Sequence, residues 1–226
     1  MTHLVQISNG VSRHVALVEE SNLRCLSGVA SVYELALLCL KGGRGLNEEV
    51  RALTQDEVLD YDAIYNGRSE WRLLAPIDVP GAPSHMLVAG TGLTHYGSAK
   101  DRQAMHASGA DKKQAAEAMT DSMRMFQWGV GGGRPKEGEI GIVPEWFYKG
   151  NGSILRGPFE PLTVPAFGED GGEEAEIVGI YIIGEDSTPR RIGMTVGNEF
   201  SGHQFEKRNY RNFAGSKLRA VWVQSW

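Results

Sequence analysis

Two glutamates at the start of an apolar segment have the type and spacing that can hold a metal ion. Along Gly168-Glu-Asp-Gly-Gly-Glu-Glu-Ala-Glu176-Ile-Val-Gly-Ile-Tyr-Ile-Ile183, strand alternation places Glu174 and Glu176 on the same face as a row of apolar side chains. Like charges at the edge of an apolar surface repel each other, and partial burial adds to the cost unless a cation lies between them. Hard cations such as Mg²⁺ or Mn²⁺ prefer carboxylate ligands. The pattern predicts a divalent-metal site, although five carboxylates within residues 169–176 also fit a solvated acidic turn.

A third acid, Glu199, follows the next predicted strand, and an antiparallel return would bring it beside the first two. A competing arrangement places Glu199, His203 and Glu206 on one face of a helix. A histidine in the ligand set would favour zinc or another transition metal over magnesium. For His203 we favour a third interpretation, a solvated helix with an ion pair to Lys207 or Arg208.

Other chemically capable residues give weaker signals. His95 lies in a glycine-bounded loop after a predicted strand and is a candidate acid or base, although a lone histidine is more often structural. The run Gly131-Gly-Gly133-Arg-Pro lacks the order of a phosphate-binding loop. One member of a basic run after the acidic site could hold a substrate carboxylate; the run comprises Lys207, Arg208, Arg211, Lys217 and Arg219. No Ser-His-Asp or Cys-His set can be assembled.

The N-terminal part of the chain carries clear local signals. Residues 3–18 predict a hairpin with Asn9-Gly10 at its turn. Ser31 and Glu34 form a capping box for a helix that Gly42-Gly43 would end.

Composition shifts then suggest two domains in an α+β protein. Residues 47–64 predict a further acidic helix, so residues 1–80 would form a small N-terminal α+β module. Pro76–Pro83 is typical of a linker. Residues 81–226 would form a second, strand-dominated domain.

The second domain has its own predicted elements. We expect a strand over residues 86–90, a helix over 112–128 and a mobile glycine-rich loop over 129–138. Further strands are predicted over residues 140–149, 174–183 and 190–197, the last two joined by a turn over 184–189.

Composition excludes several classes of protein. A net charge of −5 and a pI near 5.7 argue against a nucleic-acid binder or a ligand of anionic membranes. Cys25 and Cys39 form no disulfide or metal-binding pattern, and the N-terminus shows no signal peptide. The longest apolar stretch, residues 35–40, is too short for a membrane helix. We therefore expect a cytoplasmic protein.

Five short motifs, in order over residues 86–219, resemble the fumarylacetoacetate hydrolase family. They are Gly92-Leu-Thr-His-Tyr, Pro144-Glu-Trp-Phe-Tyr-Lys149-Gly-Asn-Gly-Ser153, Glu174-Ala-Glu176-Ile-Val-Gly-Ile, Asn198-Glu199-Phe-Ser201 and Ser216-Lys217-Leu. The sequences of these motifs are most similar to those of the sugar-acid branch of that family, which is associated with arabinose or related pentose catabolism.

The resemblance implies a mixed β-roll catalytic domain, usually a homodimer, and a small-molecule 2-oxo acid substrate that chelates Mg²⁺ or Mn²⁺. By the same resemblance, the metal ligands would be Glu174, Glu176 and Glu199. The candidate catalytic residues are Lys217, Lys149 and His95, and the candidate substrate-binding residues are Thr94, Ser153 and Asn198.

Two activities follow from the resemblance. In a dehydratase, the metal would polarise the keto group of a 2-keto-3-deoxy sugar acid, stabilise the enolate and allow the C4 hydroxyl to leave. In a hydrolase, an activated water would cleave a C–C bond of a 2,4-diketo acid or acylpyruvate. Family hydrolases carry a His and a Glu on a lid, and the aligned positions near Ser98 and Asp101 lack them, so we favour the dehydratase.

The end of the chain departs from the family. Relatives continue beyond the Lys217 segment, whereas residues 219–226 match nothing expected there. We therefore interpret the catalytic domain as partial and C-terminally truncated, and an inactive fragment is a third alternative.

Overall fold

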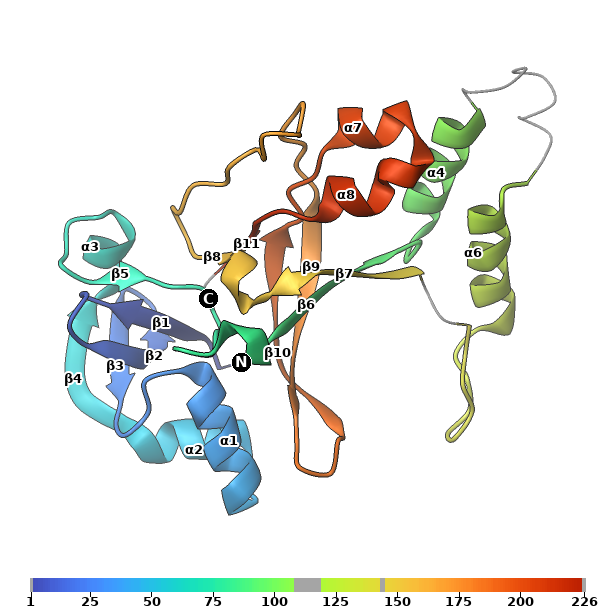
Figure 1. Ribbon diagram of the computed structural model, residues 1–226. Coiled ribbons are helices and arrows are strands. Elements are labelled where there is room, and N and C mark those ends of the chain that lie inside the picture. Colours follow the sequence, from blue (N-terminus) through green and yellow to red (C-terminus); the bar gives the residue numbers. More distant parts are fainter. Residues whose placement is uncertain (1, 108–118, 143–144, 225–226) are drawn as a thin grey trace.

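The computed structural model describes residues 2–107, 119–142 and 145–224, which form three sheets with flanking helices (Figure 1). The first sheet has the order β4-β3-β2-β1-β5. Its strands are β1 (Leu4–Ser8), β2 (Arg13–Glu19), β3 (Asn22–Leu26), β4 (Thr54–Asp60) and β5 (Arg72–Leu73). The helices α1 (Val32–Gly42), α2 (Leu46–Leu53) and α3 (Tyr61–Tyr65) accompany this sheet.

The predicted hairpin and helix cap are both present. β1 and β2 pair antiparallel around the Asn9-Gly10 turn, where Gly10 has a φ of 86°. The Ser31 hydroxyl accepts the backbone N–H of Glu34 at 3.1 Å, and Gly43 ends α1 in the left-handed conformation. These features form because their hydrogen bonds are local in sequence.

The helix predicted over residues 47–64 is wrong in its middle. The chain leaves α2 at Thr54 and continues as strand β4, which pairs with β3 through Leu26↔Thr54 and Arg24↔Val58. β4 is a largely exposed edge strand, so its polar sequence shows no core-facing alternation. Pairing with β3 therefore decides its conformation.

The predicted linker is tied to the first sheet. Asp78 accepts a hydrogen bond from the Gln6 side chain at 2.9 Å and pairs with Arg13. Val79 is buried.

The second sheet is an antiparallel pair of β6 (Leu87–Gly92) and β7 (Glu145–Asn151), with α4 (Tyr96–Ala107) and α6 (Asp121–Gly132) in the chain between them. These helices lie at the opposite end of the molecule from the first sheet (Figure 1). The sequence pattern did not indicate α4, and residues 112–118 of the predicted helix lie outside the described residues.

The glycine-rich loop predicted after that helix is partly wrong. Residues 129–132 continue α6, which ends at Gly133 with a φ of 59°. The strand predicted over residues 140–149 begins only at Glu145, and residues 143–144 lie outside the described residues.

The third sheet, of order β8-β11-β10-β9, carries the acidic segment. Its strands are β8 (Leu155–Arg156), β9 (Ala175–Ile183), β10 (Pro189–Asn198) and β11 (Val221–Val223). The predicted β9–β10 hairpin is confirmed. β11, which the motifs did not predict, lies between β8 and β10 with Val221 and Val223 buried.

Short helices complete the described chain: α7 (His203–Arg208), α8 (Phe213–Lys217) and the 3₁₀ turns Pro83–His85, Gly152–Ile154 and Tyr210–Asn212. Within the described residues, no helix has the length and apolar character needed to cross a membrane.

Candidate metal centre

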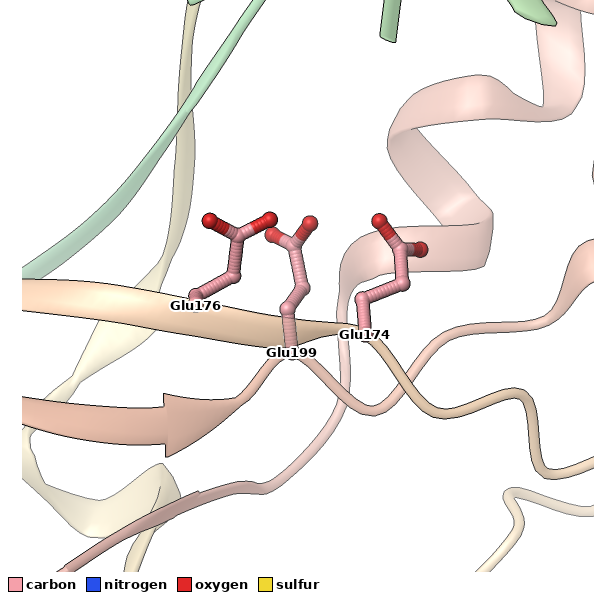
Figure 2. A group of neighbouring side chains, drawn as sticks. All are labelled: Glu174, Glu176 and Glu199. Carbon is pink, nitrogen blue, oxygen red and sulfur yellow. The ribbon is translucent and has the colours of Figure 1, made fainter. Parts of the chain in front are cut away.

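Three glutamates converge where β9 begins and β10 ends. The two strands pair with Ala175 opposite Asn198. Glu174 and Glu176 are the neighbours of Ala175, and Glu199 is the residue after Asn198, so the pairing brings the three glutamates together. The backbone N–H of Glu199 donates to the carbonyl of Glu174 at 2.8 Å. One carboxylate oxygen from each glutamate lies within 4.8 Å of the other two, and the three side chains point the same way (Figure 2).

Two buried lysines contact these carboxylates. Lys217 Nζ lies 2.5 Å from Glu174 Oε1 and 3.2 Å from Glu199 Oε2, and Lys149 Nζ lies 2.9 Å from Glu199 Oε1. Burial lowers the pKa of Lys149, although Glu199 acts in the opposite direction. Burial also disfavours the charged form of Lys217, but Glu199 and Glu174 outweigh it and raise the pKa of Lys217.

The carboxylates themselves are not equivalent. Burial alone would raise the pKa of Glu174, but the hydrogen bond and charge of Lys217 lower it to about 2. The pKa of Glu176 is raised, first by burial and then by the charges of Glu199 and Glu174. Glu176 is thus the member whose charge the protein compensates least.

The donor set suits a hard divalent cation. Three carboxylates face two ammonium groups, so negative charge is in excess at the point where the oxygens converge. Oxygen-rich, partly solvated sites of this kind are the ones that Mg²⁺ and Mn²⁺ occupy in proteins.

Two further polar residues adjoin the cluster. Ser201 is fully buried, accepts a hydrogen bond from Lys217 Nζ at 3.1 Å and donates to the carbonyl of Glu199 at 2.9 Å. His203 Nε2 lies 2.9 Å from Glu174 Oε1.

The structure corrects both sequence interpretations of His203. Helix α7 begins only at His203, so Glu199 is not on that helix and the predicted face with Glu206 does not form. The His203 ring is half-buried against Glu174. A sequence feature that could have indicated this contact is Gly172, because a Cβ at that position would lie 2.6 Å from His203 Cε1.

His95 and Thr94 lie at the start of α4. His95 is exposed, and its Nδ1 accepts the backbone N–H of Ser98 at 3.1 Å, so it caps the helix. The proximity of His95 also lowers the pKa of the Glu176 carboxyl, against the larger effect of burial. Thr94 lines a cavity of about 260 Å³ whose other walls are Leu93, Met125, Phe126, Gly129, Val130, Ile142 and Glu145.

The two remaining predicted substrate-binding residues have mainly structural contacts. Asn198 Oδ1 accepts the backbone N–H of Glu174 at 3.1 Å, so it holds the start of β9. Ser153 is exposed after β7 and donates to Asn151 Oδ1 at 2.6 Å. Among the described residues, no hydrogen bond joins Ser153 to the three glutamates.

The three sheets, with the acidic cluster at one end of the third, define a mixed α+β fold that solved enzymes share. The apo form of 2-keto-3-deoxy-D-arabinonate dehydratase matches with a TM-score of 0.62 at 14% identity, over 99% of this chain and 64% of that chain. The same enzyme complexed with magnesium and 2,5-dioxopentanoate matches with a TM-score of 0.60 at 14% identity, over the same shares.

A fumarylacetoacetate hydrolase from psychrophilic Exiguobacterium antarcticum matches with a TM-score of 0.54 at 17% identity, over 97% of this chain and 63% of that chain. The predicted resemblance to this group is confirmed at the level of fold. The chain spans less than two thirds of the length of these structures. By sequence, no protein-family model and no curated protein matches it.

Proposed function

We propose that the chain is a fumarylacetoacetate hydrolase-family, divalent-metal-dependent dehydratase of a 2-keto-3-deoxy sugar acid. The observation that carries this proposal is the convergence of Glu174, Glu176 and Glu199 beside two buried lysines. The fold shared with a dehydratase that binds magnesium supports it.

The three glutamates would hold Mg²⁺, or Mn²⁺, against the substrate's 2-oxo-carboxylate. When bound, such an ion polarises the keto group and stabilises the charge that develops as C3 loses a proton. Loss of the C4 hydroxyl, protonated to water, would complete a dehydration that keeps every carbon in one product.

The lysines differ in what they can do. Lys217 donates to Glu174, Glu199 and Ser201, so its ammonium is fixed and suited to charge stabilisation. Burial lowers the pKa of Lys149, so Lys149 gives up its proton more readily than Lys217 and is the better candidate for proton transfer. His95 remains a second candidate for the proton transfer, since it is near enough to Glu176 to lower the pKa of that carboxyl.

A hydrolase of a 2,4-diketo acid or acylpyruvate is the second candidate. The cavity beside Thr94 favours it, because Leu93, Met125, Phe126 and Ile142 would suit an apolar acyl group better than a polyhydroxylated chain. Against it, His95 caps α4, and within the described part of the chain no ion pair joins it to an acid, as the hydrolase lid would require.

The first experiment is a thermal melt of the purified chain in EDTA, in Mg²⁺, and in Mg²⁺ with pyruvate as a 2-oxo acid mimic. A ligand at about 100 times its dissociation constant adds about 2.7 kcal/mol, which is a readily measured shift. Successive rises in melting temperature would support the proposal. A melting temperature that neither Mg²⁺ nor pyruvate changes would overturn the proposal and indicate a non-catalytic remnant.

Product analysis then separates the two activities. Dehydration leaves the carbon count of the substrate intact, whereas hydrolysis of a diketo acid yields two shorter acids. Glu174→Gln is the control, and unchanged turnover in that variant would refute the metal assignment.

We further propose a cytoplasmic homodimer. Cys25 and Cys39 are buried free thiols, as is usual in a reducing compartment. The β9–β10 hairpin exposes an apolar cross-strand pair, Ile177 and Val196, together with Tyr181. Light scattering of the purified chain tests this, and a monomeric mass at high concentration would refute the dimer.

A further inference from the structure

The imidazole of His203 contacts the acidic cluster at one particular atom. Its Nε2 lies 2.9 Å from Glu174 Oε1, the same oxygen that lies 2.5 Å from Lys217 Nζ. Two groups therefore reach Oε1 from different elements, since His203 begins α7 and Lys217 ends α8. Together these two contacts fix the orientation of the Glu174 carboxylate.

The direction of the His203 hydrogen bond follows from its partner. An ionised carboxylate can only accept hydrogen bonds, and the ammonium of Lys217 pairs with Glu174 as a carboxylate. His203 therefore carries a proton on Nε2 and donates it to Glu174. A ring that donates from Nε2 cannot use that nitrogen as a metal ligand at the same time.

The ring is held in place by the loop before Glu174. It lies directly over Gly172, where a Cβ would come within 2.6 Å of His203 Cε1. Gly172 also pairs with Ser201 through two backbone hydrogen bonds of 2.8 Å. In the next residue of α7, the backbone N–H of Gln204 donates to the carboxylate of Asp170 at 3.2 Å.

We propose that His203 is a positioning residue that fixes the carboxylate of Glu174 for the metal and acts through Glu174 rather than on the ion. The inference rests on the proposed metal site. It assigns His203 a function that neither a solvated surface histidine nor a metal ligand would have.

The test measures Mn²⁺ affinity of the purified full chain by electron paramagnetic resonance of free Mn²⁺, without any substrate. His203→Leu removes the donor, and His203→Gln keeps a side-chain N–H near the same place. Lys207→Ala is the matched control, because Lys207 is exposed on the same helix. Loss of an outer-layer hydrogen bond typically weakens metal binding about 10- to 100-fold.

We expect His203→Leu to lose Mn²⁺ affinity by about tenfold or more. His203→Gln should recover most of that loss, and Lys207→Ala should match the wild type. Equal affinity in His203→Leu and wild type would overturn the inference. Equal losses in the Leu and Gln variants would also overturn it, because the ring would then act only by packing.

A spectroscopic measurement separates positioning from ligation. We expect pulsed resonance spectra of the Mn²⁺-loaded wild type to lack coupling to a directly bound nitrogen, and such a coupling that disappears in His203→Gln would overturn the inference. Failure of the wild type itself to bind Mn²⁺ would overturn the metal site as well. Tight wild-type binding that His203→Leu leaves unchanged would overturn the positioning role alone.

Discussion

Lys217 Nζ lies 2.5 Å from Glu174 Oε1, although 43 positions separate the two residues in the sequence. The same ammonium lies 3.2 Å from Glu199 Oε2, so one lysine bridges two of the three candidate ligands. This buried cation makes the acidic cluster tolerable in the absence of a metal ion, because it offsets part of the repulsion among the carboxylates. Stability and the proposed metal binding would therefore be coupled at this point.

Replacing Lys217 by Met should destabilise the chain in EDTA. Removing one partner of a buried pair leaves an uncompensated charge, and since Glu174 is partly solvated we expect a loss of about 2 kcal/mol. Mg²⁺ should restore more stability in this variant than in wild type, because it neutralises the same carboxylates. Urea unfolding with and without Mg²⁺ measures both effects. Lys207→Met is the control, and equal Mg²⁺ effects in Lys217→Met and wild type would contradict the prediction.

Glu174 should make the stability of the metal-free chain depend on pH. The pKa of Glu174 is lowered from 4.5 to about 2, so its ionised form contributes stability that is fully present above 4.5. That contribution is lost as the pH falls toward 2, and it amounts to at most about 3 kcal/mol. Urea unfolding in EDTA between these pH values should show a steeper decline for wild type than for Glu174→Gln. If the free energies of unfolding of wild type and Glu174→Gln fell in parallel with pH, the prediction would be contradicted.

Glu176→Gln should separate metal binding from stability. The pKa of Glu176 is raised by burial and by its acidic neighbours, so the neutral amide should leave the metal-free chain as stable as wild type or slightly more stable. The rise in melting temperature with Mg²⁺ should shrink, because one oxygen ligand is lost. Glu173→Gln, exposed and one position before Glu174, is the control. An unchanged Mg²⁺ shift in Glu176→Gln would remove Glu176 from the ligand set.

Gly90→Ala in β6, a strand of the neighbouring sheet, should disturb the cluster of glutamates. A Cβ on Gly90 would lie 2.6 Å from Phe147 Cε2 and 2.8 Å from Glu199 Oε1. The ring and the carboxylate must therefore shift, and we expect a loss of about 1–3 kcal/mol with weaker Mg²⁺ binding. Gly193→Ala in β10 is the control, because nothing lies within 4 Å of its Cβ position. The melting temperatures and Mg²⁺ shifts of the two variants give the comparison.

Local sequence signals predicted the elements that depend on local contacts. The Asn9-Gly10 hairpin, the Ser31 cap and the β9–β10 hairpin all have their hydrogen-bond partners nearby in the chain. The meeting of Glu199 with Glu174 follows from that last hairpin, so its outline was predictable.

Other features depend on pairing between distant segments. β4 is a strand because it pairs with β3, and its polar sequence alone favoured a helix. The contact of His203 with Glu174 required the start of α7 to lie over Gly172, and only the glycine hinted at this close approach. Such contacts depend on the tertiary arrangement and not on periodicity.

The place of β11 has a consequence for the order in which the molecule assembles. The β9–β10 hairpin can bring the glutamates together early, whereas Lys217 adjoins a strand that must enter between β8 and β10 from far along the chain. The acids would then meet before their ammonium partner arrives. We expect Mg²⁺ to speed refolding as well as to stabilise the folded chain, and stopped-flow refolding in Mg²⁺ and in EDTA measures this. A cation at this centre would thus act as a counter-ion during folding as well as at the proposed metal site of the folded chain.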